Sequence, residues 1–181
     1  MRSAASRRTV HAATAAILVL PFIVDWATFR YLVVALAVVW MLIERLRLRT
    51  PRIHAAFATV FPVFREDETT RVSGAGWLMV GYAMTVWFPQ PAATAGILVA
   101  AFADPMASAI GTQFSRDKQK TVAGSVAFLA VAIVVLWSVG SRWPVVAIVA
   151  GVGTVLERWP LGLNDNVVVP PAVAAAVFAL A

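Results

Sequence analysis

The sequence predicts an all-α protein: a polytopic bundle of about seven membrane-spanning helices and one short re-entrant or interfacial helix, forming a single integral membrane domain over residues 1–181. Three observations support this fold class. Hydrophobic residues make up 61% of the chain and charged residues 13%, against about 45–50% and about 25% in soluble domains. The mean hydropathy is +0.82. Apolar runs recur along the whole chain, and no stretch is polar enough for a separate soluble domain.

The predicted helices begin with the apolar run 10–26. Arg7 and Arg8 before it resemble the start of an export signal, but no small-residue cleavage site follows, so we expect a retained first helix. The second span is 29–44. The next run, 53–64, is shorter than the ~20 residues that a crossing needs, and such pieces are commonly re-entrant or interfacial. The five remaining spans are 72–88, 92–110, 122–139, 143–158 and 167–181.

The basic residues predict the orientation of this bundle. With the N-terminus inside and seven crossings, thirteen of the fifteen Arg and Lys residues fall on the cytoplasmic side, and only Arg30 and Arg142 fall outside. Basic residues collect in the cytoplasmic loops of membrane proteins. We therefore expect an integral protein of the cell membrane with a cytoplasmic N-terminus and active face and with its C-terminus outside. If 53–64 also crossed the membrane, the later basic loops would lie outside, and the excess of basic residues on the cytoplasmic side would disappear.

Acidic residues share the predicted cytoplasmic face, because only Asp25 of the nine lies on the other side. A metal–polyphosphate site needs basic residues that bind phosphate oxygens and acidic residues that bind magnesium. The alternative is a solvated surface of mixed charge. Loop orientation also accounts for the formal charge of +6 without a nucleic-acid partner. The chain has no cysteine, which excludes disulfides, thiolate metal sites and cysteine nucleophiles.

Asp104, followed by Pro105, lies inside the apolar run 92–110. A carboxylate in a membrane span is costly and is a functional hypothesis by default. Proline disfavours helical backbone at the residue before it. The helix therefore either breaks and restarts with Asp104 as its N-cap, or continues and places Asp104 on one face with Ser108 and Gly111. Small residues on that face would admit a ligand or a neighbouring helix.

The loop that follows carries Lys118 and Lys120 and ends at Thr121, a predicted N-cap for the next helix. Backbone N–H groups and the helix dipole favour phosphate at a helix start, and the nearby cations add to this preference. The spacing of a Walker motif is missing. The loop is thus a candidate phosphate site of another kind.

Several motifs resemble, in chain order, those of the CTP-dependent lipid kinases, a family that includes dolichol kinase, phytol kinase and fungal diacylglycerol kinase. The family's central signature is similar to the run Asp104-x-x-Ala107-x-x-x-Gly111, Phe114 and Lys120-Thr121-x-x-Gly124-Ser125. Its early Arg-Lys-x-x-His, its acidic loop and its terminal motif are similar to Arg7-Arg8-x-x-His11, to the segment around Glu66, and to Glu157 with Asp165-Asn166-x-x-x-Pro170. Ser115 departs from the pattern, because the family usually has glycine after the phenylalanine.

The resemblance implies transfer of the γ-phosphoryl group of CTP, with Mg²⁺, to the hydroxyl of a membrane lipid alcohol. Polyprenol or dolichol, phytol or geranylgeraniol, and diacylglycerol types all fit. Asp104 would be a magnesium ligand and Asp165 a second ligand or the base, while Asn166 would help to ligate the ion or to orient its ligands. Glu66 and Glu157 are further candidate ligands.

His11 would share a helix face with the early arginines and either bind phosphate, carry a proton, or be a structural residue at the interface. Gly111 and Gly124 would let the backbone approach the nucleotide. The candidate nucleotide-binding residues are Arg7, Arg8, Ser108, Gly111, Lys118, Lys120, Thr121, Gly124 and Ser125.

Two other functions stay open. A CTP:phosphatidate cytidylyltransferase would make CDP-lipid and pyrophosphate from the same nucleotide, although the pattern over 104–125 favours the kinase. A membrane transporter would also use a broken helix and an intramembrane acid. The sequence shows no inverted repeat, which argues against a transporter.

Overall fold

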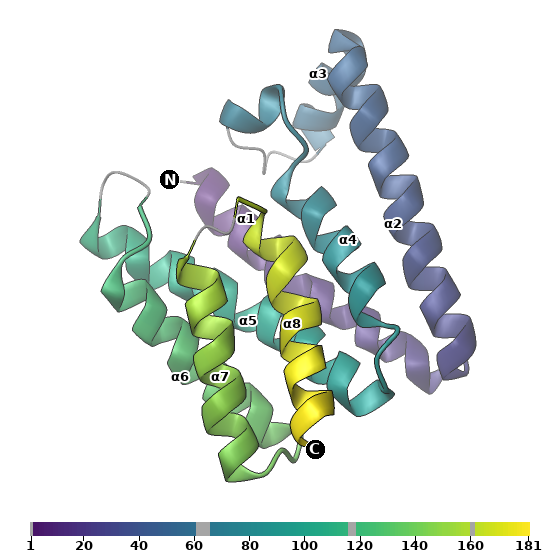
Figure 1. The fold of residues 1–181 in the computed structure, drawn as a ribbon. Coiled ribbons are helices and arrows are strands. Elements are labelled where there is room, and N and C mark those ends of the chain that lie inside the picture. The colour runs from purple at the N-terminus through teal and green to yellow at the C-terminus, as the bar shows by residue number, and fades with distance from the viewer. Residues whose placement is uncertain (1, 61–65, 116–118, 160–161) are drawn as a thin grey trace.

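The computed structural model describes residues 2–60, 66–115, 119–159 and 162–181 (Figure 1). Every regular element within these ranges is a helix, so the all-α prediction is confirmed. The first apolar run forms α1 (Arg2–Ala13) and continues as the 3₁₀ helix η1 (Thr14–Phe22). The other elements are α2 (Trp26–Arg49), α3 (Pro51–Val60), η2 (Glu66–Thr69), α4 (Gly74–Thr85), α5 (Gln90–Phe114), α6 (Val122–Ser138), α7 (Trp143–Arg158) and α8 (Asp165–Leu180).

Four of these helices begin at side-chain N-caps, which satisfy backbone N–H groups that the first turn leaves without partners. Asp25 caps α2, Ser73 caps α4, Thr121 caps α6 and Asn164 caps α8. The predicted cap at Thr121 is therefore confirmed, with its hydroxyl accepting from Gly124 N at 3.0 Å. The caps fix where helices start, and two of those starts lie at the candidate site.

Two described helices, α2 and α5, are long and apolar enough to cross a membrane. The apolar helices α6 and α8 have 17 and 16 residues, fewer than the ~20 of a typical span. The short predicted run 53–64 corresponds in its described part to α3, which has 10 residues. The count of seven spans is not confirmed by these lengths and stays a prediction.

The central helix is α5, which contacts α1, α6 and α8 and joins two hydrophobic clusters (Figure 1). One cluster packs α5 with α6, α7 and α8 around Phe128 and Leu136. The other packs α5 with α2 and α4 around Phe29 and Tyr82. Because α5 belongs to both clusters, it holds Asp104 in a fixed position relative to both halves of the bundle.

Pro105 does not break α5, which runs without interruption from Gln90 to Phe114. Pro105 itself is buried, and so are its neighbours Ala101, Ala103 and Ala107. Neighbouring helices packed around such a segment keep its backbone helical despite the missing N–H donor. The structure thus selects the continuous arrangement, in which Asp104 projects from the side of a helix.

Glycines allow α8 to approach α4 and α5 very closely. A Cβ at Gly81 would overlap the Asn166 carbonyl oxygen, and one at Gly96 would overlap the Pro170 carbonyl oxygen. Only glycine leaves room for a backbone at this distance. The first turns of α8, which carry Asp165, are therefore positioned by backbone contact with α4 and α5.

A buried charged network joins the end of α2 to the segment before α4. The Arg47 guanidinium is 1% exposed and donates to Glu44 Oε2 at 2.6 Å and to the carbonyl oxygens of Glu68 and Arg71 at 2.8 and 2.9 Å. Glu44 also accepts from the Ser73 backbone N–H and hydroxyl. These bonds fix the segment that leads into Gly74, and sequence analysis missed them because Arg47 and Glu44 read as parts of a charged helix end.

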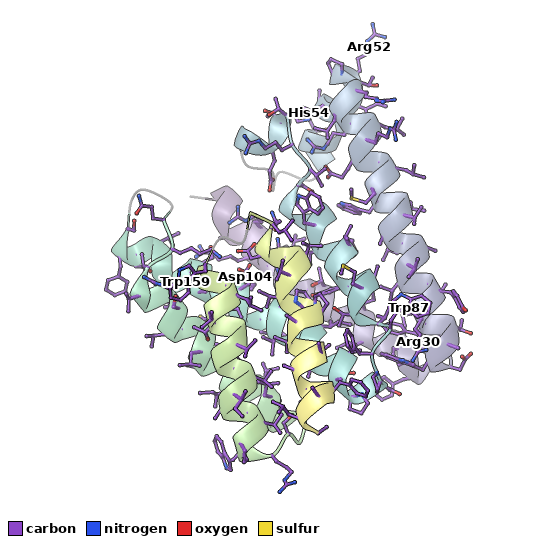
Figure 2. The ribbon with its side chains drawn as sticks, viewed as in Figure 1. Arg30, Arg52, His54, Trp87, Asp104 and Trp159 are labelled. Atoms are coloured by element: carbon purple, nitrogen blue, oxygen red, sulfur yellow. The ribbon has the colours of Figure 1, made fainter. Side chains whose placement is uncertain are left out.

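The loops between helices and the chain termini lie at two ends of the bundle. Figure 1 shows the N-terminus, α3 and the start of α8 toward one end, and the C-terminus and the α6–α7 connection at the other. In Figure 2, Arg52 and His54 lie at the first end and Arg30 with Trp87 at the second. This separation is what the predicted orientation requires, while the orientation in a membrane stays a prediction.

Candidate metal and phosphate site

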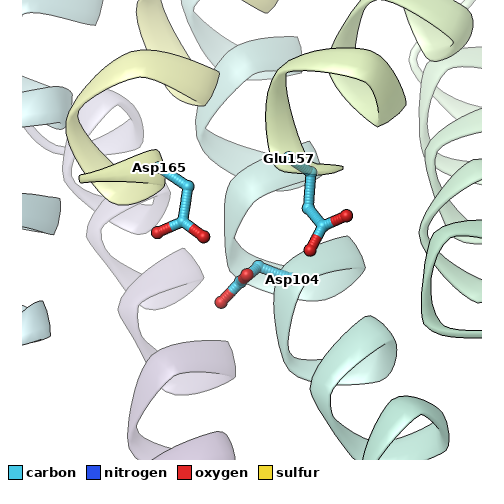
Figure 3. Close-up of side chains that lie close together, drawn as sticks. All are labelled: Asp104, Glu157 and Asp165. Atoms are coloured by element: carbon cyan, nitrogen blue, oxygen red, sulfur yellow. The ribbon is translucent and has the colours of Figure 1, made fainter. Parts of the chain in front are cut away.

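Three carboxylates from three helices meet at the first end of the bundle (Figure 3). They belong to Asp104, Glu157 and Asp165, here called the carboxylate cluster, and one oxygen from each lies within 4.8 Å of the others. Like charges this close repel one another. The cluster therefore requires a cation if all three groups are to be ionised.

Packing and capping place the three side chains. Asp104 projects from the second half of α5, and Glu157 is the penultimate residue of α7. Asp165 opens α8, where Asn164 Oδ1 accepts from Asn166 N at 3.1 Å. Glu157 is 6% exposed, whereas the side chains of Asp104 and Asp165 are 28% and 30% exposed. The cluster thus has a buried floor and an open mouth.

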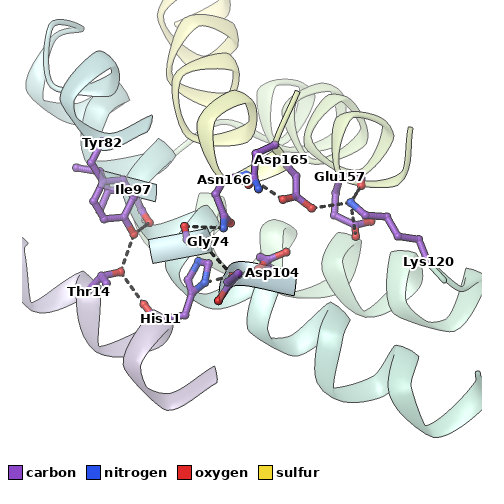
Figure 4. A network of polar contacts seen from close by, with 12 residues as sticks. His11, Thr14, Gly74, Tyr82, Ile97, Asp104, Lys120, Glu157, Asp165 and Asn166 are labelled. Carbon is purple, nitrogen blue, oxygen red and sulfur yellow. Dashed lines mark hydrogen bonds and ion pairs between the residues drawn. The ribbon is translucent and has the colours of Figure 1, made fainter. Parts of the chain in front are cut away.

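Lys120 supplies the cation (Figure 4). Its Nζ lies 2.7 Å from Asp165 Oδ2 and 3.2 Å from Glu157 Oε1, and it also donates to the Glu157 carbonyl oxygen. Partial burial lowers the pKa of Lys120, but the charges of Asp165 and Glu157 and their hydrogen bonds outweigh burial and raise that pKa above its ordinary value. Lys120, predicted as a phosphate-binding residue, therefore also binds the carboxylates.

His11 approaches the cluster from α1, on the side away from Lys120 (Figure 4). Its Nδ1 lies 3.7 Å from Asp104 Oδ2, which is beyond hydrogen-bond length. The His11 carbonyl accepts from Thr14 Oγ1 at 2.6 Å, and that hydroxyl pairs with Tyr82 OH at 2.8 Å. The Thr14–Tyr82 pair thus joins η1 to α4 next to His11, and it had no signal in the sequence.

Asn166 connects the cluster to α4. Its Nδ2 donates to the Gly74 carbonyl at 3.0 Å, and the Gly74 N–H donates to Glu68 Oε1 at 2.9 Å. The role that this geometry gives Asn166 is to orient the first turn of α8.

A pocket with a volume of about 200 Å³ opens beside the cluster. Lys120, Asn164 and Asp165 form its polar wall, and its apolar wall consists of Leu156, Trp159, Leu163 and Val168. Trp159 is 61% exposed, so its ring is accessible. Neither Trp159 nor Asn164 was a predicted site residue, although both lie within two residues of one.

The carboxylate cluster fits a hard divalent cation. Mg²⁺ prefers carboxylate oxygens at 2.0–2.1 Å, so two oxygens on one ion lie at most about 4.2 Å apart. The spread of 4.8 Å would need only small side-chain movements to meet this limit. Among the described residues, Glu157 Oε2 is buried without a hydrogen-bond partner, which leaves a ligand atom available inside the cluster.

Gly111 and Gly124 have little free space around them. A Cβ at Gly124 would lie 2.9 Å from the Ala107 carbonyl oxygen, and one at Gly111 would lie 3.1 Å from Thr121 Oγ1. Both glycines thus lie at the contact between α5 and α6, and approach of the backbone to a nucleotide there stays a prediction. The physical reason for the contact is that small residues on two facing helices allow those helices to pack closely.

The remaining candidates are spread around the cluster. The Ser125 hydroxyl is buried and accepts from Arg158 at 3.2 Å, and the Ser108 carbonyl accepts from Thr112. Arg7 and Arg8 lie on α1, the helix that carries His11. Lys118 and the side chain of Glu66 lie outside the described part of the chain.

Comparison with known proteins gives no family for this chain. We find no match among protein-family models, curated proteins or solved structures.

Proposed function

We propose that the protein is a CTP-dependent kinase that transfers a phosphoryl group to the hydroxyl of a membrane lipid alcohol at the cytoplasmic face. The observation that carries the proposal is the carboxylate cluster with Lys120 at its edge and an open pocket beside it. Phosphoryl transfer needs charge neutralisation and positioning more than covalent catalysis. The motif resemblance to CTP-dependent lipid kinases supplies the choice of nucleotide and acceptor.

In the proposed reaction, bound Mg²⁺ would neutralise charge on the nucleotide phosphates. Asp104, Glu157 and Asp165 would hold the ion, and Lys120 would bind a phosphate oxygen. The alcohol oxygen forms a bond to the γ-phosphorus, the bond to the β–γ bridging oxygen breaks, and CDP leaves. The alcohol proton passes to a carboxylate oxygen that would not hold the ion, and the second oxygen of Asp165 is our candidate because Asp165 is partly exposed and lines the pocket.

The position of Asp104 suits an acceptor that stays in the membrane. Asp104 lies ten residues before the end of α5 at Phe114, which is about 15 Å along a helix. In a membrane-spanning α5 the cluster would therefore lie below the level of the helix end. The lipid tail would remain in hydrocarbon while its hydroxyl reaches the cluster, and the nucleotide would enter from the aqueous side.

The test uses purified full-length protein, a panel of polyprenols, phytol-type alcohols and diacylglycerol, and CTP labelled at either the α- or the γ-phosphate. We expect γ-label on the lipid, no α-label, and a requirement for Mg²⁺. Asp104→Asn should lower the rate by about 10²–10³-fold, the usual cost of one electrostatic group at a reacting phosphate. Asp25→Asn is the control, because Asp25 caps α2 at the other end of the bundle.

Three results would contradict the proposal. Cytidine label on the lipid would identify a cytidylyltransferase instead. Full activity of Asp104→Asn would refute the site. The absence of nucleotide turnover with every lipid, with CTP and with ATP, would favour the transporter.

A further inference from the structure

Lys120 contacts two of the three carboxylates that a metal ion in the carboxylate cluster would use. Its Nζ contacts oxygens of two of the three cluster residues, Asp165 and Glu157, at 2.7 and 3.2 Å. Nζ also donates a hydrogen bond to the Glu157 carbonyl oxygen. A divalent ion bound by the cluster needs oxygens of the same two carboxylate groups, those of Asp165 and Glu157. Ammonium and metal therefore compete for one set of ligands.

Both cations cannot keep their ligands at the same time. Two positive charges a few ångströms apart repel, and this repulsion is strong where the groups are partly buried. Glu157 is 6% exposed, so water screens little at the floor of the cluster. When a metal ion enters, Lys120 must give up at least part of its contact with Asp165 and Glu157.

The pocket provides the place to which the ammonium can move. The Lys120 side chain is 37% exposed and lines the pocket, together with Trp159 and Asn164. Phosphate oxygens in that pocket would offer Lys120 new charge-assisted hydrogen bonds. A long, flexible lysine stem can reach either partner.

We propose that Lys120 exchanges between the carboxylate cluster and a phosphate group, so that the metal ion and the nucleotide bind cooperatively. Without nucleotide, Lys120 offsets part of the negative charge of the cluster and keeps metal affinity low. A phosphate-bearing ligand draws Lys120 away and frees Asp165 and Glu157 for the metal. This inference rests on the proposed function for the identity of the nucleotide, but not for the competition between the two cations.

The test measures Mn²⁺ binding to the purified full-length protein at pH 8, by electron paramagnetic resonance and calorimetry, without lipid. In the absence of nucleotide, Lys120→Met should bind Mn²⁺ about tenfold more tightly than the wild type, within the usual 5–150-fold range of coupling between two sites. Lys120→Arg retains the positive charge and should keep Mn²⁺ affinity near the wild-type value. Thermal unfolding of each variant shows whether it is folded.

A second measurement tests the exchange itself. Adding the non-hydrolysable analogue β,γ-methylene-CTP should tighten Mn²⁺ binding to the wild type, and should tighten it much less in Lys120→Met. Weaker or unchanged Mn²⁺ binding by folded Lys120→Met overturns the inference. So does an equal effect of the analogue on both proteins.

The failure of this inference can be told apart from that of the proposed function. Tighter Mn²⁺ binding by Lys120→Met, with no lipid phosphorylation by the wild type, would support the competition and reject the kinase. Lipid phosphorylation by the wild type, with unchanged Mn²⁺ binding by Lys120→Met, would support the kinase and reject the competition. Asp104→Asn should weaken Mn²⁺ binding in either case, and unchanged binding would show that the cluster is not the metal site.

Discussion

Arg47 and Lys120 are two cations whose neighbours give them opposite roles. Arg47 is fully enclosed, and its guanidinium contacts Glu44 on α2, His54 on α3 and the segment leading to α4. Lys120 is about one-third exposed and lies beside a pocket. A buried, fully engaged charge holds structure together, whereas a partly exposed charge can exchange partners.

Replacing Arg47 therefore gives a prediction about stability. Arg47→Met leaves the Glu44 carboxylate buried without its cation, a loss that typically costs about 3–5 kcal/mol. We expect a correspondingly lower midpoint in thermal or denaturant unfolding. Arg49→Met is the matched control, because Arg49 lies two residues later on α2 with an exposed side chain, and surface changes stay within about 0.5 kcal/mol.

A second variant separates the charge from the packing. Removing the carboxylate as well, in Glu44→Gln with Arg47→Met, should recover part of the lost stability because no uncompensated buried charge remains. Equal destabilisation by Arg47→Met and Arg49→Met would contradict the structural role of the network.

At the level of elements, the candidate site depends on how closely α8 approaches α4. The closest point is Gly81, which faces the Asn166 carbonyl oxygen. Asn166 also bonds the Gly74 carbonyl, so α8 and α4 are joined at the turn that carries Asp165. A change in this contact moves a member of the carboxylate cluster without touching it.

Gly81→Ala tests this dependence. The added methyl group has no room, and overpacking of this kind typically costs about 1–3 kcal/mol. We expect lower unfolding stability together with weaker Mn²⁺ binding, because α8 must shift and take Asp165 with it.

Gly151→Ala in α7 is the control, since its Cβ would meet nothing within 4 Å and alanine favours a helix by ~1 kcal/mol over glycine. It should be neutral or stabilising. Normal stability and Mn²⁺ binding in Gly81→Ala would mean that α8 is not positioned by this contact.

At the scale of the whole molecule, helix length and orientation are linked. α6 has 17 residues and is thus about 26 Å long, against a hydrocarbon core of about 30 Å. Such short helices cross a bilayer only if it thins locally or if flanking residues reach the interface. Arg30 lies 5.9 Å from the ring centres of both Trp26 and Trp87, an arrangement suited to the interface at the second end.

The cysteine-free sequence permits a direct test of orientation. Gln119→Cys lies just before α6, and Ser141→Cys lies between α6 and α7. In intact cells a membrane-impermeant maleimide should label Ser141→Cys and leave Gln119→Cys unlabelled until the cells are opened. Labelling of both positions from the same side would contradict a crossing by α6 and with it the seven-span arrangement.

Much of the helical pattern was predictable because hydrophobicity is a local property. The runs 122–139 and 143–158 agree with α6 and α7 to within one residue. The start of the first helix was harder to predict, because α1 begins at Arg2, well before the apolar run 10–26. Polar residues at the start of a helix carry no hydropathy signal.

The sequence by itself determined the helical class, the cap at Thr121 and the acidic residues from which a cluster could form. Tertiary structure decided which of them meet: Asp104, Glu157 and Asp165 come from three helices that are far apart along the chain. It also decided that Pro105 stays within a continuous helix and that Gly111 and Gly124 serve helix packing. Caps and periodicity depend on neighbours within a few residues, whereas these outcomes depend on which helices pack together, and that is fixed by contacts between distant parts of the chain.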